Sequence, residues 1–226
     1  MMKHSCFLIA FESKTMPDEK NTVLSKRRRP KQARSTQLVE DILTAAAHVL
    51  REQGAHRFTT ARVAERAGVS IGSVYQYFPN KNALLFRLQS DEWVQTSTML
   101  RSILQDPTQP HLDRLRTAIR TFVRSEKAET DLRKALSQAA PLYGDTAEAR
   151  QLLADGHAMV GAFVEEMLPN APLEKHRLAV GILAIFFEKI AESICDRADT
   201  EDVNLYSDAM ADMICGYFSK LRYEIS

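Results

Sequence analysis

Hydroxyl-bearing and basic side chains between positions 59 and 81 have the types and spacing needed to bind a polyanion. Thr59 and Thr60 stand where a short helix can begin, and the free N–H groups of a helix start suit an anion such as phosphate. Ser70 and Ser73 stand at the start of a second short segment, and the ammonium group of Lys81 follows it. These groups favour non-covalent recognition of phosphates, which position a protein, and of base edges, which carry sequence information.

The basic residues are concentrated in one part of the chain. The 226 residues hold 30 Lys and Arg against 29 Asp and Glu, so the formal net charge is only +1. Residues 26–87, however, hold twelve basic and four acidic residues, which gives this segment a charge of +8 and leaves −7 for the rest. Such an excess on a small domain indicates a phosphate-binding surface. A solvated basic face is the alternative if the charge is considered alone.

The densest part of this charge is the run Lys26-Arg-Arg-Arg-Pro-Lys31. We interpret residues 26–34 as a flexible basic arm that lies along phosphates or enters a minor groove. The contacts expected from it are those of Arg27, Arg28, Arg29 and Lys31. A nuclear-import signal and a solvated tail are the alternatives.

The N-terminal segment, the lengths of the apolar stretches and the composition exclude several other classes of protein. Residues 1–25 are predicted to be a disordered leader, because their apolar run, residues 6–11, is short for a signal peptide and far too short for a membrane span. No later stretch reaches 18 uncharged apolar residues, which predicts a soluble protein. The three cysteines form no Cys-x-x-Cys pair, which predicts reduced thiols and no metal site. No glycine-rich phosphate loop is present, and no cofactor is expected.

The spacing of apolar residues predicts an all-α fold from about residue 35 onward. Apolar residues of 35–53 recur at i, i+3, i+4 and i+7, Gly54 can end this helix, and alternating strand patterns are essentially absent. About nine helices are predicted, near residues 35–53, 60–67, 71–78, 80–106, 110–127, 130–138, 146–168, 172–197 and 201–222.

The second and third predicted helices form a helix-turn-helix pattern. Thr59 or Thr60 caps the first of them and Gly68 ends it, while Ser70 caps the second and Pro79 stops it. In a helix-turn-helix, the second helix enters the major groove of DNA. The residues near its start, here Ile71, Gly72 and Ser73, reach the base edges.

Residues 58–84, with the sequence FTTARVAERAGVSIGSVYQYFPNKNAL, closely resemble the DNA-binding signature of TetR-type transcriptional regulators. The resemblance extends back through residues 35–53, and it is specific because the capping threonines, turn glycine, Tyr-x-Tyr-Phe and Asn-Lys occur together in register. It implies a three-helix DNA-binding domain over residues 35–85. A larger helical domain for effector binding and dimerisation would then cover residues 86–226.

The resemblance also implies which residues touch DNA. Positions matching Gly72, Ser73, Tyr75 and Tyr77 lie at the DNA in such family members, and Lys81 matches a phosphate-contacting lysine. For Gly72 a neutral surface glycine is the alternative, and for Tyr77 a purely structural role. With the arm, the predicted DNA-binding residues are Arg27, Arg28, Arg29, Lys31, Thr59, Thr60, Arg62, Ser70, Ile71, Gly72, Ser73, Tyr75, Tyr77 and Lys81.

One position departs from the family pattern. Some family members have a base-reading arginine where this chain has Ala61, and alanine cannot make a bidentate contact to guanine. Sequence discrimination is therefore expected from the 71–78 helix, or from Arg62 if its side chain turns inward.

The last two predicted helices are apolar on more than one face. A helix with two buried faces packs on both sides, and we interpret the second face as a homodimer interface. A helix that is simply central in its own domain is the alternative. The predicted interface residues are Val180, Leu183, Phe187, Ile190, Met210, Met213 and Tyr217.

Taken together, the resemblance implies a dimeric repressor that a small-molecule effector releases from a near-palindromic operator in double-stranded DNA of the bacterial cytoplasm. The effector is expected to be apolar or amphipathic and to contact Trp93, Phe122, Tyr143, Met159, Phe163 and Phe186, for each of which core packing is the alternative. A TetR-like DNA-binding protein without a ligand, architectural or protein-recruiting, is a second interpretation. A helical-bundle enzyme is disfavoured, because no Glu-x-x-His motif for a two-metal site occurs and no catalytic residue is predicted.

Overall fold

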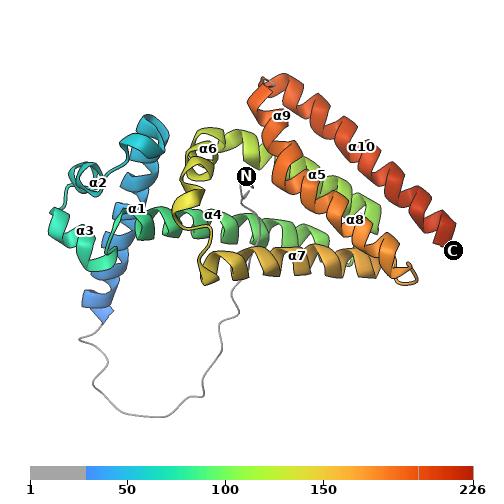
Figure 1. Ribbon diagram of the computed structural model, residues 1–226, viewed down its shortest axis with the longest axis horizontal. Helices are drawn as coiled ribbons and strands as arrows, with labels where there is room; N and C mark the ends of the chain where they lie inside the picture. The colour runs from blue at the N-terminus through green and yellow to red at the C-terminus, as the bar shows by residue number, and fades with distance from the viewer. Residues whose placement is uncertain (1–28, 198, 226) are drawn as a thin grey trace, which may run out of the picture. The chain divides into compact units, whose positions relative to one another are not determined.

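The computed structural model describes residues 29–197 and 199–225, and over these residues the chain is helical without strands (Figure 1). The first four helices are α1 (Arg29–Arg57), α2 (Thr60–Ala67), α3 (Ile71–Tyr77) and α4 (Lys81–Leu104). They are followed by α5 (His111–Ala128), α6 (Thr130–Ala139), the short 3₁₀ turn η2 (Ala140–Leu142) and α7 (Ala147–Met167). The chain ends with α8 (Leu173–Ile185), the π-helical turn η3 (Phe186–Ile190), α9 (Ala191–Arg197) and α10 (Thr200–Ile225). The predicted all-α fold class is thus confirmed.

Helix α1 starts six residues earlier than the sequence pattern predicted. It begins at Arg29, so residues 29–34 of the predicted flexible arm are helical, whereas residues 26–28 lie outside the described part. The residues after Pro30 are good helix formers, and proline is tolerated in a first turn, where its missing N–H would be unpaired anyway. Gly54 takes a φ of 69° and interrupts the helix where a helix end was predicted.

The predicted helix over residues 172–197 is divided by the π turn η3. Buried residues recur there at intervals of four, at Ala179, Leu183, Phe187, Ala191 and Cys195. A regular helix of 3.6 residues per turn would rotate this stripe away from the core. The wider π turn, in which the N–H of Ala191 donates to the carbonyl of Phe186, corrects the drift. The single predicted helix therefore becomes α8, η3 and α9.

The chain divides into two compact units between Gln89 and Ser90, inside α4. The described part of the first unit contains α1, α2, α3 and the beginning of α4. Its core is apolar and fully or nearly fully buried, with contributions from each helix: Ile42, Ala46, Val49, Leu50, Phe58, Val63, Val74, Phe78, Leu84 and Leu85.

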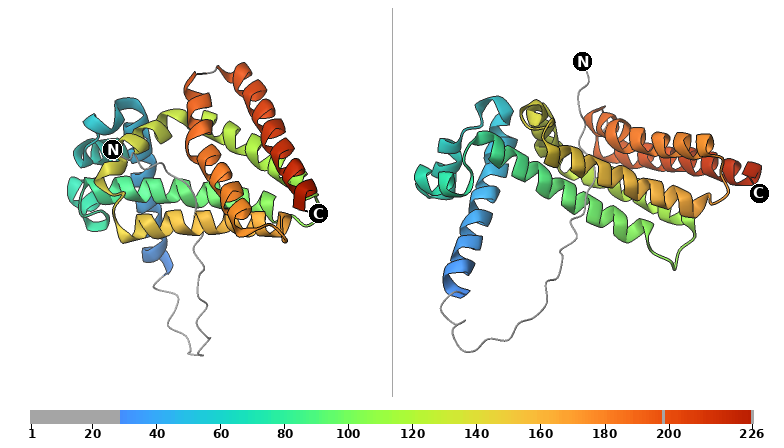
Figure 2. Two further views of the ribbon diagram at one scale, coloured as in Figure 1. Left: turned by 45° about the vertical axis from the view of Figure 1, so that its right-hand side comes forward. Right: turned by 60° about the horizontal axis from the view of Figure 1, so that its bottom comes forward.

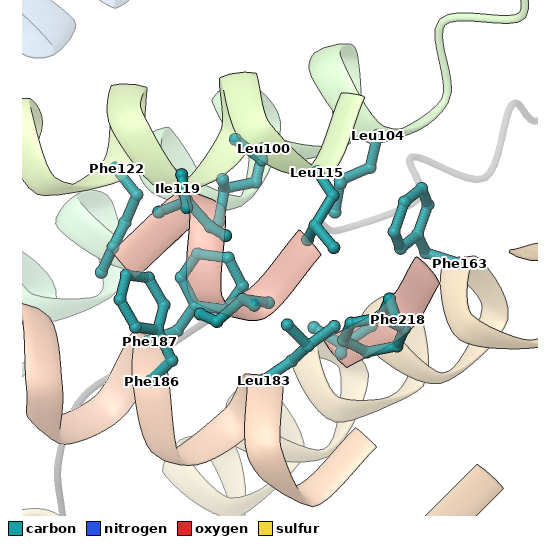
Figure 3. Packing of buried hydrophobic residues seen from close by; sticks show 14 of the residues in the cluster. Leu100, Leu104, Leu115, Ile119, Phe122, Phe163, Leu183, Phe186, Phe187 and Phe218 are labelled. Atoms are coloured by element: carbon teal, nitrogen blue, oxygen red, sulfur yellow. The ribbon is translucent and has the colours of Figure 1, made fainter. Parts of the chain in front are cut away.

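The second unit is organised around α5. This helix packs against α10 and α9, while α7 packs against α8 (Figure 2). Phe122 of α5 meets the ring of Phe187 edge-on at 5.1 Å between centroids, and Phe187 meets Phe186 at 5.2 Å (Figure 3). Offset and edge-on contacts of this kind are favourable beyond the area that they bury. The interior of this unit is therefore a dense aromatic and aliphatic core.

The six predicted effector residues all have buried side chains. Phe122, Met159, Phe163 and Phe186 belong to the core cluster around α5, and Trp93 and Tyr143 are buried elsewhere in the second unit. The hydroxyl of Tyr143 donates to the carbonyl of Leu136 at 3.0 Å. In the structure these residues pack within the protein, so their assignment to an effector remains a proposal.

The predicted interface residues differ in burial. Leu183 and Phe187 lie in the core of the chain itself, so a second copy cannot contact them without unfolding this core. Val180, Ile190, Met210 and Tyr217 are partly buried against that core, and only Met213 is a largely exposed member of the set, at 68%. The sequence pattern could not separate these groups, because both faces of the helices are apolar.

Other large apolar side chains are exposed on the same two helices and were not among the predicted interface residues. Leu173 and Tyr223 lie near helix ends, and the others are Leu178 and Ile185 on α8 and Leu205 and Tyr206 on α10. We call Leu178, Ile185, Leu205, Tyr206 and Met213 the exposed α8/α10 residues. Exposed apolar side chains mark an interaction surface where they form one contiguous patch. These residues are therefore the part of the two helices that a second copy could contact.

Cys195 and Cys215 pack as small apolar side chains. Their Sγ atoms lie 3.5 Å from the carbonyl oxygens of Val123 and Leu112, and both thiols are buried. Burial raises the pKa of each thiol above its ordinary value, which disfavours the reactive thiolate at neutral pH. Cys6 lies outside the described residues.

A buried arginine joins α5 to α7. Arg114 is 4% exposed, donates to the carbonyl of Leu104 at 2.6 Å and to Glu166 Oε1 at 2.8 Å, and lies over the ring of Phe163. The hydrogen bond from Arg114 lowers the pKa of Glu166 below its ordinary value, and the charges of Arg114 and His111 act in the same direction.

This ion pair makes stability depend on pH in a defined direction. A carboxyl whose pKa is lowered by folding stabilises the folded state above its unfolded-state pKa, and this contribution disappears as the pH falls through the folded-state pKa. We expect Glu166→Gln to reduce the free energy of unfolding at neutral pH, because a neutral amide attracts the Arg114 guanidinium less than a carboxylate does. The loss should be only about 1 kcal/mol, since the Glu166 side chain is 53% exposed and water screens the pair.

Urea unfolding of wild type and variant at neutral and at acidic pH measures this effect, with the exposed Glu174→Gln as control. The difference between wild type and Glu166→Gln should shrink as the pH falls. A difference that stays constant with pH would show that the carboxylate charge is not its cause.

No helix in the described parts of the chain is both long enough and apolar enough to cross a bilayer.

Candidate nucleic-acid interface

The turn between α2 and α3 is built by caps that the sequence predicted. Thr59 is the N-cap of α2, and its hydroxyl accepts from the N–H of Arg62 at 3.3 Å. Gly68 ends α2 in the left-handed conformation, with φ 67° and ψ 28°, and its N–H bonds back to the last turn. Because glycine adopts positive φ without steric cost, the chain can reverse here within three residues and begin α3.

The start of α3 is fixed by two serines. Ser70 is the N-cap, and its Oγ accepts from the N–H of Ser73 at 3.0 Å and lies 2.8 Å from the Ser73 hydroxyl. Val74 and Phe78 anchor the helix in the core of the first unit, while Ile71 is largely exposed. The side of α3 opposite the two anchors is therefore open to solvent.

Two tyrosines hold α3 against the helices on either side of it. The hydroxyl of Tyr75 lies 3.1 Å from Thr60 Oγ1 of α2, and that of Tyr77 lies 3.0 Å from Ser35 Oγ of α1. Their rings point in different directions, as expected for positions two apart in a helix. Thr60 is itself buried, so its hydroxyl serves this contact within the protein.

Lys81 lies at the start of α4 and reaches the end of α1. Its Nζ donates to the carbonyl of Ala55 at 3.0 Å, while Asn80 Oδ1 caps α4 by accepting from the N–H of Ala83 at 2.8 Å. An ammonium group carries three donors, so this contact leaves protons of Lys81 for a phosphate.

Arg62 has a partner within the protein. Its guanidinium donates to the carbonyl of Arg57, the last residue of α1. The alternative of base reading by Arg62 is therefore disfavoured by this structure, and α3 remains as the element that can read bases.

The structure describes only part of the basic arm. Arg27 and Arg28 lie outside the described residues, and Arg29 and Lys31 fall in the first turn of α1. The structure brings the remaining predicted residues together around α2, α3 and the start of α4. Gln76 on α3 is also exposed, and it was not predicted as a DNA-binding residue although its place between Val74 and Phe78 indicates an outward direction.

Comparison with known sequences agrees with this architecture. Residues 42–88 match a family model described as bacterial regulatory proteins, tetR family, and residues 110–221 match one described as tetracyclin repressor-like, C-terminal domain. The nucleoid occlusion factor SlmA of Vibrio vulnificus is 30% identical over 106 residues, covering 46% of this chain and 53% of SlmA. The chain thus spans about half the length of these curated relatives. The HTH-type transcriptional repressor KstR of Rhodococcus jostii is 22% identical over 77% of this chain and 81% of its own.

Solved structures share the fold at lower sequence identity. The fatty acid degradation regulator FadR of Bacillus halodurans has a TM-score of 0.62 and 17% identity, covering 79% of this chain and 98% of its own. NalD, the secondary repressor of a multidrug efflux pump in Pseudomonas aeruginosa, has a TM-score of 0.55 and 20% identity, covering 83% and 96%.

Proposed function

The chain belongs to the TetR family of bacterial regulatory proteins, and we propose that it is a sequence-specific DNA-binding transcriptional repressor that acts as a homodimer. The observation that carries the proposal is the geometry of α3. It is capped by Ser70, anchored by Val74 and Phe78, and open on its opposite side, within a segment of charge +8. A helix presented in this way fits the major groove, and the charge attracts the DNA backbone.

The proposed binding mode divides the contacts between positioning and reading. Thr59, Lys81 and the basic arm bind phosphates, which orient the domain without reading sequence. Helix α3 contacts base edges. In the dimer, two α3 helices about 34–36 Å apart meet successive major grooves on one side of a near-palindromic operator.

Release from DNA is proposed to follow binding of a small apolar or amphipathic effector in the second unit. The match of residues 110–221 to a tetracyclin repressor-like domain supports this location. Helix α4 belongs to both units, so it is the covalent element through which a change in one can reach the other. An effector acts by binding better to a conformation whose α3 spacing does not fit the operator.

A DNA-binding protein without a small-molecule effector is the second candidate. It is favoured by the likeness to SlmA, whose name describes a nucleoid occlusion factor. A calorimetric and thermal-shift screen of apolar and amphipathic compounds against the operator-bound protein separates the two candidates. A compound that binds the protein and releases it from the operator supports the ligand-controlled repressor. If no compound releases the protein from the operator, the alternative is supported.

Selection of bound sequences from a random pool of duplex DNA tests DNA recognition directly. We expect an enriched near-palindrome whose half-sites lie one helical turn, or a multiple of it, apart. A pool that stays random after several rounds would contradict sequence-specific binding, and a single unpaired half-site would contradict the dimer.

The phosphate contacts predict a salt dependence of binding. Replacing Arg27, Arg28 and Arg29 by alanine should reduce the slope of log K against log salt concentration by up to about 3. Lys81→Ala should weaken binding to all sequences about equally and reduce the slope by about 1. Fluorescence anisotropy at several salt concentrations measures both slopes.

A matched control removes the same charge from the second unit, by alanine at Lys134, Arg150 and Arg197, all of which are exposed. This variant should keep the wild-type slope. If the arm variant kept it too, residues 27–29 would not contact the DNA backbone.

A further inference from the structure

Gln76 occupies the centre of the open side of α3. It is two residues after Val74 and two before Phe78, and both of these are buried, at 0% and 6% exposure. At 100° per residue, a spacing of two residues places Gln76 about 160° around the helix from Val74 and, in the other direction, about 160° from Phe78. The side chain of Gln76 therefore points almost directly away from the core. Gln76 is exposed, as this geometry requires.

The residues that share this side with Gln76 leave space around it. Gly72 lies four positions earlier and Ser73 three positions earlier, which places both on the same side of the helix. Outside the adjoining residues and the backbone of the helix itself, the nearest atom that a Cβ at Gly72 would meet is Ser70 Oγ at 3.7 Å, so packing does not require a glycine there. Its missing side chain instead permits a close approach of another molecule beside Gln76.

The other polar groups of α3 already have partners. The hydroxyl of Ser73 contacts Ser70, and the hydroxyls of Tyr75 and Tyr77 contact α2 and α1. No hydrogen bond within the described residues engages the side-chain amide of Gln76. It is therefore the group on this helix whose donor and acceptor are both available to a ligand.

We propose that Gln76 is the principal base-reading residue of this protein and that it specifies adenine in each half-site of the operator. This inference rests on the proposed DNA-binding function. In the major groove adenine presents N7 as acceptor and the N6 amino group as donor. The Nε2 group of glutamine donates to N7 while Oε1 accepts from N6, so one side chain recognises one base through two hydrogen bonds.

The first test compares the sequences selected from a random duplex pool by wild type, Gln76→Ala and Gln151→Ala. Gln151 is an exposed glutamine of α7, so its variant is the matched control. Wild type and control should enrich adenine at one position of each half-site, and Gln76→Ala should lose about 5- to 150-fold of discrimination at that position only. Circular dichroism should show an unchanged fold, since the replaced side chain is exposed.

The second test removes the acceptor from the DNA instead. Replacing that adenine by 7-deazaadenine deletes N7 without changing Watson–Crick pairing. It should weaken binding of wild type and of Gln151→Ala but leave the affinity of Gln76→Ala unchanged. Such a double-mutant cycle attributes the loss to the contact between this residue and this atom.

The outcomes separate the inference from the function on which it rests. If the wild-type protein enriches a palindrome and Gln76→Ala keeps every base preference of the wild-type protein, the inference is overturned and the DNA-binding function stands. If Gln76→Ala relaxes the preference for another base, the assignment to adenine is overturned. If wild type enriches no sequence, both fail.

Discussion

Replacing Ile185 and Met213 together by aspartate is expected to convert the protein from a dimer to a monomer. Both side chains belong to the exposed α8/α10 residues, at 58% and 68% exposure, so the substitutions add charge without disturbing the core. In an interface between two copies each aspartate would be desolvated beside apolar groups, at a cost of several kcal/mol.

The loss of the dimer should carry a large loss of operator affinity. Two linked DNA-binding units bind a palindrome with an avidity of about 10²–10⁴ over one unit, and a monomer has only one. We expect the double variant to lose about this factor on a full operator and to keep the wild-type affinity for an isolated half-site. Sedimentation and fluorescence anisotropy on the two DNA lengths measure both quantities.

The matched control places the same charge on an exposed apolar position of another helix, in Val94→Asp on α4. This variant should remain dimeric and bind the full operator normally. A double variant that sediments as a dimer would show that copies associate through some other surface. A wild-type protein that is monomeric at micromolar concentration would contradict the predicted homodimer itself.

Replacing Phe122 by alanine is expected to lower the free energy of unfolding by about 3–5 kcal/mol. Its ring is fully buried and packs edge-on against Phe187, so removal leaves a cavity that the helices around α5 cannot close completely. Phe122→Leu, which keeps most of the volume, should cost much less. Urea unfolding followed by far-ultraviolet circular dichroism measures both.

The same experiment decides between two interpretations of this residue. A phenylalanine that lines an open effector cavity has few neighbours to lose, and its alanine variant would be destabilised by less than about 1 kcal/mol, since the cost depends on the contacts removed. Tyr223→Ala, at a site 87% exposed, gives the baseline for a surface ring. A value for Phe122 near this baseline would contradict the role in core packing.

The helix-turn-helix could be predicted almost residue by residue from the sequence. Caps and turns depend on neighbours only a few positions away, so Thr59, Gly68 and Ser70 indicated both ends of α2 and the start of α3 correctly, and α3 ends at Tyr77, one residue before its predicted end. The apolar period indicated the long helices for the same reason. Where the outcome depended on a distant partner, as for the π turn at residues 186–190, the local pattern predicted an uninterrupted helix.

The contacts of individual side chains were the part that only the tertiary structure decided. The sequence alone determined an all-α chain with a basic helix-turn-helix, because charge, caps and apolar spacing are local properties, and the regulatory role came from its resemblance to TetR-type regulators. It could not show that Arg62 binds the end of α1, that Leu183 and Phe187 are buried while Ile185 and Met213 are exposed, or that Gln76 lies at the centre of the open side of α3. Each of these depends on which helix packs against which, and therefore on residues far apart in the chain.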